Sequence, residues 1–125
     1  MGDNEITGEI ISAAIEVHST LGPGLLESAY EVALKRELEL RGLHVRQQVA
    51  LPVVYKDERI ELGYRIDLLV EEKIVVEIKS VEALHDVHLA QILTYLKLSQ
   101  RRFGLLINFN VALLKDGVRR VVHGY

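Results

Sequence analysis

The sequence contains no cysteine, only two prolines and no long run of hydrophobic residues. Without cysteine, the chain forms neither disulfide bonds nor cysteine-ligated zinc sites. The N-terminal segment MGDNEIT is acidic and lacks the basic and apolar regions of a signal peptide. Because no apolar run is long enough to cross a membrane, these absences together predict a soluble, cytoplasmic protein without membrane partners.

Positive charge is also scarce, since the chain has 15 lysines and arginines against 18 acidic residues and a formal net charge of −3. A protein that binds nucleic acid with its whole surface is ordinarily basic, so any contact with nucleic acid must use a local patch. The 125 residues, of which 49% are hydrophobic, show no internal repeat and no linker. This length and composition predict one folded domain over residues 1–125.

Two helices are predicted in the first third of the chain. Hydrophobic residues recur at helical spacing over residues 6–21, with Asp3 or Asn4 available as the N-cap. The Gly-Pro-Gly segment at 22–24 is expected to end this helix. A second helix is predicted over residues 25–41.

The hydrophobic period changes to two after the second helix, which is typical of strands. Further on, a helical segment lies between two strongly hydrophobic runs, and this order predicts two parallel strands joined by a right-handed crossover. The predicted elements are strands at 43–55, 60–70 and within 73–82, a helix at 86–99, a strand at 103–109 and a short last strand after Asp116-Gly117. The order α-α-β-β-β-α-β predicts an α/β sandwich, a mixed β-sheet flanked by helices.

Two charged residues interrupt the third strand, in the segment KIVVEIKSVE. Glu77 and Lys79 are two positions apart, so their side chains leave the same face of the strand. A three-residue loop at 71–73 places Asp67 opposite Glu77, whereas a two-residue loop shifts this register by one position. We favour the longer loop, because tight hairpins require Gly, Asn or Asp at positive φ and Glu-Glu suits them badly.

The favoured register brings two carboxylates together, with the Cβ atoms of Asp67 and Glu77 about 5 Å apart. Such a like-charge pair is destabilising, and an unpaired buried carboxylate is strongly so. Lys79 supplies one compensating charge. A divalent cation would supply two more, and carboxylate oxygens are hard ligands suited to Mg²⁺ or Mn²⁺.

Three motifs carry a resemblance to a known family. Asp67 on one strand, followed by Glu-Ile-Lys at 77–79 on the next, resembles the PD-(D/E)xK nuclease superfamily. The segment GLLESAY at 24–30 fits the pattern that names the GxxExxY branch of that superfamily, with Gly, Glu and Tyr in place. Gln91 and Tyr95 supply the Gln-x-x-x-Tyr feature of exonuclease-like members. The resemblance implies a restriction-endonuclease-like fold.

The resemblance also implies a metal-dependent nuclease that acts on nucleic acid, with DNA as the expected substrate. It implies that Asp67, Glu77 and the carbonyl of Ile78 hold Mg²⁺ or Mn²⁺, with Glu27 approaching from the second helix as a further ligand. The metal would polarise the phosphoryl oxygen and acidify a bound water. Lys79 would orient or help deprotonate that water and offset negative charge in the transition state.

The resemblance gives Gln91 and Tyr95, which lie one helical turn apart on one face, the role of positioning the water or a phosphate. The superfamily pattern often has proline before the aspartate, where this chain has Ile66. This departure affects little, because the proline shapes the backbone and binds nothing.

Basic residues and histidines complete the set of candidate residues. The available phosphate contacts are Lys97, Arg101, Arg102, Arg119 and Arg120. His18, His85 and His88 lack a convincing metal-ligand spacing, and we interpret them as mainly structural. His88 lies one turn before Gln91 and is a minor candidate for the site.

Structural interpretations of the acidic residues remain open alongside the functional one. The negative charge of Glu27, in the first turn of a helix, is stabilised by the helix dipole. Glu77 with Lys79 can form an exposed ion pair worth under about 1 kcal/mol.

Two functions of different classes follow. The first is a metal-dependent nuclease, which the full set of charged residues favours. The second is a non-catalytic nuclease-fold binding or assembly module, which the acidic balance and small size favour. A chain of this size is expected to need a homodimer or a protein partner to hold a duplex.

Overall fold

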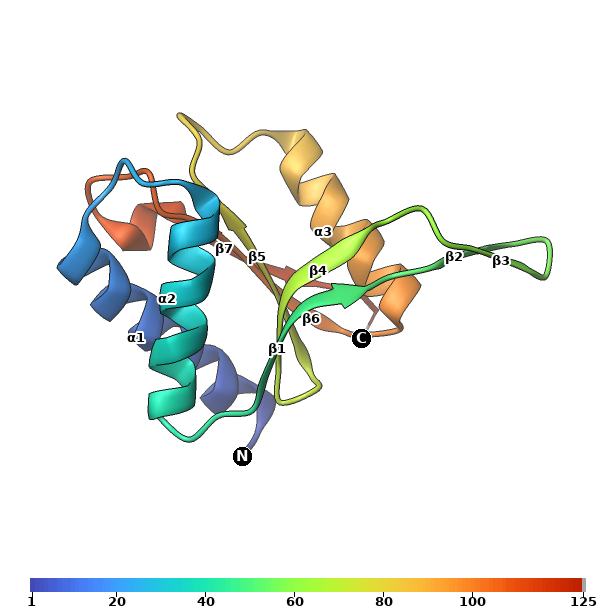
Figure 1. The fold of residues 1–125 in the computed structure, drawn as a ribbon, viewed down its shortest axis with the longest axis horizontal. Helices are drawn as coiled ribbons and strands as arrows, with labels where there is room; N and C mark the ends of the chain where they lie inside the picture. The colour runs from blue at the N-terminus through green and yellow to red at the C-terminus, as the bar shows by residue number, and fades with distance from the viewer. Residues whose placement is uncertain (125) are drawn as a thin grey trace.

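A computed structural model describes residues 1–124 and contains a mixed five-stranded sheet with helices on both faces (Figure 1). The helical elements are α1 (Asp3–Leu21), α2 (Glu27–Leu40), α3 (Asp86–Ser99) and a short 3-10 turn, η1 (Leu114–Gly117). The strands are β1 (Val45–Ala50), β2 (Val53–Tyr55), β3 (Glu58–Ile60), β4 (Arg65–Val70), β5 (Ile74–Lys79), β6 (Phe103–Asn108) and β7 (Val118–Val122). No helix within residues 1–124 is long and apolar enough to cross a membrane.

The strand order in the main sheet is β1-β4-β5-β6-β7. Neighbouring strands are antiparallel except for β5 and β6, which are parallel and are joined through α3. The predicted α/β sandwich, its mixed sheet and its parallel crossover are therefore confirmed. The short last strand predicted after Asp116-Gly117 is also confirmed: it is β7, which begins at Val118 and lies at the edge of the sheet.

Hydrophobic side chains form one core on each face of the sheet. Helices α1 and α2 pack over one face, where Ile10 and Leu34 meet Ile107. Helix α3 packs over the other face, where Ile92 meets Leu106. All of these residues are fully buried, and each such side chain contributes roughly 1.5–3 kcal/mol to folding.

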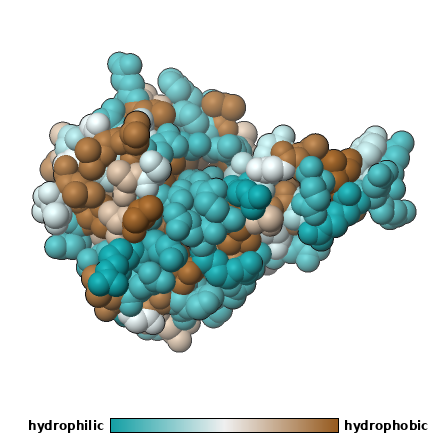
Figure 2. All heavy atoms as spheres, in the orientation of Figure 1, coloured by the Kyte–Doolittle hydropathy of each residue, from teal (hydrophilic) through white to brown (hydrophobic). Residues whose placement is uncertain are grey.

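The two long strands predicted at 43–55 and 60–70 are each divided, which corrects the prediction. Strands β2 and β3 pair only with each other and form a separate hairpin that projects from the main sheet (Figure 1). Pro52 lies at the first break and has no N–H to donate to a ladder. Gly63 lies near the second break with φ 80°. Hydrophobic residues are visible on this projecting hairpin (Figure 2).

The predicted alternation of faces along the first strand is also wrong beyond its middle. Val45 packs beneath α1 and α2, whereas Val49 and Leu51 pack on the α3 side of the sheet. Gln48 has φ 53°, a left-handed conformation that breaks the period of two. The register places Gln48 opposite Asp67, so the irregular backbone lies beside a candidate site residue.

The ends of the first two helices differ slightly from the prediction. The N-cap of α1 is Gly2, without a side-chain cap, and not Asp3 or Asn4. The Gly-Pro-Gly segment ends α1 as predicted, with Gly22 at φ 71°. Helix α2 begins at Glu27, two residues later than predicted.

Gly117 packs against the end of β6, at a point that supports the segment following β5. A Cβ atom on Gly117 would lie 2.1 Å from the carbonyl oxygen of Asn108. The Asn108 side chain in turn accepts a hydrogen bond from the Val81 N–H at 3.1 Å and donates one to the Val81 carbonyl at 3.0 Å. Close packing at Gly117 therefore helps to fix the chain just beyond Lys79.

We predict that Gly117→Ala lowers the free energy of unfolding by about 1–3 kcal/mol, because the added methyl group forces backbone apart. Gly8→Ala is the matched control, since a Cβ atom at Gly8 in α1 meets no other atom within 4 Å. Alanine at this helical position should raise stability by up to about 1 kcal/mol. Urea denaturation measures both changes, and a Gly117→Ala protein as stable as the parent would contradict the close approach.

Candidate functional site

The hairpin between β4 and β5 brings the two predicted carboxylates together. Val70 pairs with Ile74, which confirms the three-residue loop, and regular pairing ends at Leu68 with Val76. At the next position, backbone amides donate to side-chain carboxylates and no longer to backbone carbonyls. The Asp67 N–H donates to Oε2 of Glu77 at 2.8 Å.

The Ile78 N–H completes this exchange by donating to Oδ2 of Asp67 at 2.9 Å. One oxygen of each carboxylate is thus fixed by a backbone amide. Backbone pairing of β4 with β5 ends before this point, and the carboxylates of Asp67 and Glu77 accept the two amide hydrogens in place of backbone carbonyl groups.

Burial raises the pKa of both carboxyl groups above the ordinary values. Glu77 is only 3% exposed, and burial, followed by repulsion from Asp67, raises its pKa to about 8. Burial also raises the pKa of Asp67 to about 6, although the Ile78 N–H acts in the opposite direction. The positive charge of Lys79 lowers the pKa of each group without cancelling the effect of burial. Near neutral pH the pair therefore retains a proton, chiefly on Glu77, unless a further cation compensates the negative charge.

Glu31 is a third acidic residue near this pair, and the sequence interpretation missed it. Its carboxylate is buried and accepts hydrogen bonds from the amide groups of Gln47 at 2.6 Å and Gln48 at 2.9 Å. The Gln48 amide also donates to Oδ1 of Asp67 at 3.3 Å. The negative charge of Glu31 contributes to the raised pKa values of Asp67 and Glu77. Gln47, the only polar residue of its alternating series, was the available indication.

Lys79, Gln91 and Tyr95 form a connected series on the α3 side of the sheet. The Lys79 ammonium donates to Oε1 of Gln91 at 3.0 Å, and the Gln91 amide donates to the Tyr95 hydroxyl at 3.3 Å. Burial, followed by the charge of Glu77, raises the pKa of Tyr95. Since Glu77 is buried and Lys79 bonds to Gln91, the alternative of an exposed Glu77–Lys79 ion pair is wrong.

The GLLESAY segment supports the site from the opposite helix layer. The Tyr30 hydroxyl donates to the Gly22 carbonyl and accepts from the Leu25 N–H, and the Tyr30 ring stacks on Phe109 at 4.5 Å between centroids. The Ser80 hydroxyl donates to the Leu25 carbonyl at 2.6 Å. The motif therefore anchors the residue that follows Lys79.

Glu27 also contacts this turn, because its Oε2 accepts the Ser80 N–H at 3.3 Å. Within residues 1–124, no group of three or more His, Asp or Glu side chains lies close enough together to hold a metal ion. The structure therefore does not bring Glu27 to the Asp67–Glu77 pair, and its role as a ligand stays a prediction, as does that of the Ile78 carbonyl.

The predicted phosphate contacts are dispersed. Arg101 and Arg102 precede Phe103, which pairs with Ile74, so they lie at the end of β5 remote from Lys79. Arg101 also donates to the carbonyl of Glu72 at 3.1 Å and to its carboxylate at 3.3 Å. The remaining three residues are exposed, on α3 and β7: Lys97, Arg119 and Arg120.

The histidines have structural contacts, as expected. His18 is buried and its Nε2 lies 2.8 Å from the Val111 carbonyl oxygen. His88 accepts the His85 N–H at 3.0 Å through Nδ1 and so caps the start of α3. The structural interpretation is confirmed, and the capping contact accounts for His88.

The oxygen donors at the separated strands fit a divalent cation. Magnesium is commonly held by one or two carboxylates while it keeps several waters, so a third protein ligand is not required. Asp67 and Glu77 provide two such groups, and every fully buried side-chain nitrogen or oxygen atom within residues 1–124 has a hydrogen-bond partner. Any carboxylate oxygen of Asp67 or Glu77 that lacks a hydrogen-bond partner is therefore accessible to solvent or to an ion.

Comparison with known proteins gives one match. A family model described as the PD-(D/E)XK nuclease superfamily matches residues 4–121. Searches of curated proteins and of solved structures found no match to this chain. The matched segment contains all the residues of the site described above.

We predict that the metal-free protein, kept in the presence of a chelator, loses stability as the pH rises from about 5 to about 8. Glu77 has a raised pKa in the folded state, so folding binds protons in this window and the stability present at low pH declines as they dissociate. Glu77→Gln, which keeps an oxygen acceptor for the Asp67 N–H, should make the decline shallower. Urea denaturation at several pH values measures it.

Glu58→Gln on the exposed hairpin is the control and should leave the pH dependence unchanged. A chelated parent protein whose stability rises across this window, or a Glu77→Gln protein with an unaltered decline, would contradict the assignment of Glu77.

Proposed function

This chain belongs to the PD-(D/E)XK nuclease superfamily, and we propose that it is a metal-dependent nuclease that hydrolyses phosphodiester bonds in DNA. One observation carries the proposal. The buried carboxylate of Glu77 and the partly buried carboxylate of Asp67 lie together where the pairing of β4 with β5 ends, and the positive charge of Lys79 acts on both. Placing two repelling acids at one point is costly, and a divalent cation bound between them would offset that cost.

We assign the cation site to Asp67 and Glu77. A bound Mg²⁺ or Mn²⁺ would polarise the phosphoryl oxygen and lower the pKa of a water molecule. The amides of Asp67 and Ile78 fix one oxygen of each carboxylate, so the two side chains are held in place before a cation arrives. Hydrogen bonds from Gln47 and Gln48 hold the Glu31 carboxylate in place near the Asp67–Glu77 pair.

Lys79 is the residue we assign to the attacking water and to charge that develops on the phosphate. Its ammonium has three N–H donors, and Gln91 accepts one of them at 3.0 Å. The other two are available to a water or to a phosphate oxygen. Gln91 is itself restrained by Tyr95, so both act chiefly by positioning Lys79.

The segment at 24–30 supports assignment to the GxxExxY branch of the superfamily. The Tyr30 hydroxyl holds the Leu25 backbone, and the Leu25 carbonyl holds Ser80 after β5, so the spacing of the pattern has a structural use here. The candidate phosphate contacts are divided among α3, β7 and the segment before β6, and this dispersal supports a homodimer or a protein partner for holding a duplex.

We predict that Asp67→Asn abolishes both the stabilisation by Mn²⁺ and the cleavage of nucleic acid. In chelator at pH 8 the variant should be as stable as the parent or more stable, since a repelling charge is removed while an oxygen remains to accept the Ile78 N–H. The parent should gain several degrees in melting temperature in Mn²⁺, because the ion binds only the folded state. Thermal melts and a nicking assay measure these effects.

Asp57→Asn is the control for this experiment. Asp57 lies in the hairpin turn with φ 66°, a conformation that asparagine tolerates, so this variant should keep the response to Mn²⁺ and the cleavage. Loss of stability on Asp67→Asn without any effect of Mn²⁺ on the parent would contradict the proposed site. Stabilisation by Mn²⁺ without cleavage of any nucleic acid would favour the binding-module alternative.

We further predict weak binding to nucleic acid, because the chain is acidic overall. The binding should decrease strongly with salt, because arginine–phosphate contacts supply the attraction. Joint charge reversal of Arg119 and Arg120 should reduce the slope of log affinity against log salt by about two. Charge reversal of Arg101 should have a smaller effect, because Glu72 already engages it. Binding that ignores salt, or that survives reversal of all four arginines at 101, 102, 119 and 120, would exclude these contacts.

A further inference from the structure

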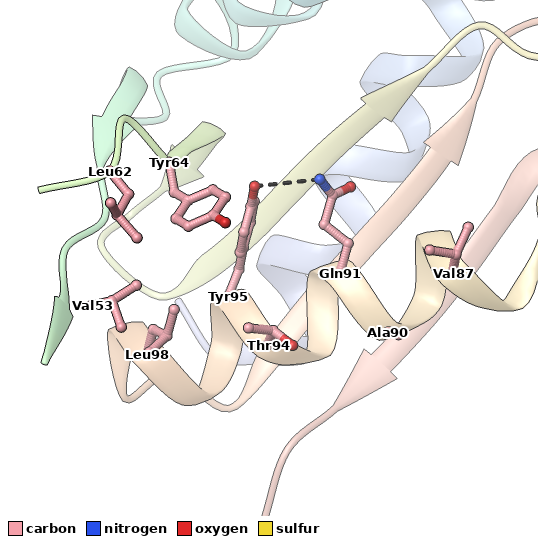
Figure 3. A pocket seen from close by; sticks show the side chains of 9 residues that line it. All are labelled: Val53, Leu62, Tyr64, Val87, Ala90, Gln91, Thr94, Tyr95 and Leu98. Atoms are coloured by element: carbon pink, nitrogen blue, oxygen red, sulfur yellow. Dashed lines mark hydrogen bonds between the residues drawn. The ribbon is translucent and has the colours of Figure 1, made fainter. Parts of the chain in front are cut away.

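An open pocket of about 520 Å³ lies between α3 and the base of the β2–β3 hairpin (Figure 3). Its walls are mainly hydrophobic side chains that the fold leaves accessible to solvent. Leu62 is 58% exposed on the hairpin side, and Val87 is 68% exposed on α3. Exposed apolar surface that is concentrated in a concavity is characteristic of binding sites.

The pocket adjoins the proposed cleavage site through two shared residues. Gln91 and Tyr95 line the pocket, Gln91 accepts the hydrogen bond from Lys79, and Tyr95 accepts one from Gln91. Figure 3 shows the dashed contact between them along one wall, with Tyr64 facing Tyr95 from the hairpin side. A molecule in the pocket would therefore be separated from a phosphate at Lys79 by the side chain of Gln91.

Of the two aromatic residues that line the pocket, Tyr95 is buried and Tyr64 is open to solvent, so only Tyr64 offers a ring for stacking. Tyr64 and Tyr95 have centroids 6.4 Å apart and planes inclined by 54°, so they are not stacked on each other. Tyr64 is 46% exposed, which leaves its ring accessible. Successive bases in single strands stack on such rings, and the Gln91 amide and the Thr94 hydroxyl can bond to the edge of a base.

Charge gives a second reason to assign this pocket to a base. The chain has a net charge of −3, and Arg101 is engaged by Glu72 at the remote end of β5. Phosphate contacts alone therefore supply little attraction near the site. Base stacking is nearly independent of charge and would supply the binding energy that the surface lacks.

We propose that this pocket accepts an unpaired nucleobase next to the phosphate that is cleaved, so that single-stranded or locally unpaired nucleic acid is the preferred substrate. This inference rests on the proposed function, which places a phosphate at Lys79. In a paired duplex the faces of each base are covered by its neighbours, and withdrawing one base costs a few kcal/mol. A pocket with one exposed aromatic ring recovers only part of that energy.

The test measures binding of a short single-stranded oligonucleotide that carries the fluorescent base 2-aminopurine, in chelator and at low salt, so that cleavage plays no part. Stacking on Tyr64 should quench the fluorescence. Tyr64→Ala should weaken binding by roughly 5- to 150-fold, the effect of losing one base–aromatic stack, whereas Tyr64→Phe should bind as the parent does. The same sequence as a duplex should bind more weakly and should not respond to either substitution.

Two further variants separate a local effect from a folding defect. Tyr55→Ala is the matched control, because Tyr55 is an exposed tyrosine of the same hairpin that does not line the pocket. Val87→Glu places a negative charge at the rim and should also weaken binding. Glutamate in the first turn of α3 is favourable for the helix, so the fold should be preserved.

The outcomes distinguish this inference from the proposed function. The expected binding pattern without cleavage in Mg²⁺ or Mn²⁺ would support the pocket and contradict the nuclease. Cleavage of duplex and single strands at equal rates, unaffected by Tyr64→Ala and Val87→Glu, would overturn the pocket and leave the nuclease. Equal losses on Tyr55→Ala and Tyr64→Ala would also overturn it, as would capture of a protein segment in the pocket with no response to nucleic acid.

Discussion

Two carboxylates stand where backbone groups would otherwise continue the pairing of β4 with β5. The amides of Asp67 and Ile78 donate to Glu77 and Asp67 respectively, so each acid satisfies an amide of the neighbouring strand. This exchange lets the strands separate without leaving buried amides unpaired, which would be costly. It also fixes two like charges side by side inside a largely buried region, and the surrounding structure has to accommodate that repulsion.

Several features around the site follow from this constraint. Lys79 lies close enough to lower the pKa of both acids, and the turn after it is held by Glu27, the Leu25 carbonyl and Asn108. Residues at the start of α2 therefore hold the turn after Lys79 from one side of the sheet, while Gln91 of α3 bonds to Lys79 on the other side. A divalent cation would supply the charge that Lys79 alone does not, and nucleases of this superfamily would use it to activate water and polarise the phosphate.

Local rules predicted much of this arrangement. The three-residue loop and the parity of Glu77 and Lys79 depend only on neighbouring residues, so the register of the acids could be derived before the structure was known. Glu31 could not be found in this way, because its approach depends on how α2 packs across β1 and on the positive φ of Gln48. The same irregular backbone reversed the faces of the first strand. Pro52 is a sequence signal for a break in the strand, but the hydrophobic alternation on both sides of it predicted one continuous strand.

The central claim is that Asp67 and Glu77 form a repelling pair that a divalent cation relieves. Nuclear magnetic resonance of ¹³C-labelled carboxyl groups, titrated with and without Mg²⁺, tests it most directly. In chelator the pair should titrate above the ordinary range, with an apparent pKa that approaches 8, and Mg²⁺ should move both titrations to lower pH. Carboxyl groups that titrate at their ordinary values in chelator, or that do not respond to Mg²⁺, would contradict the account.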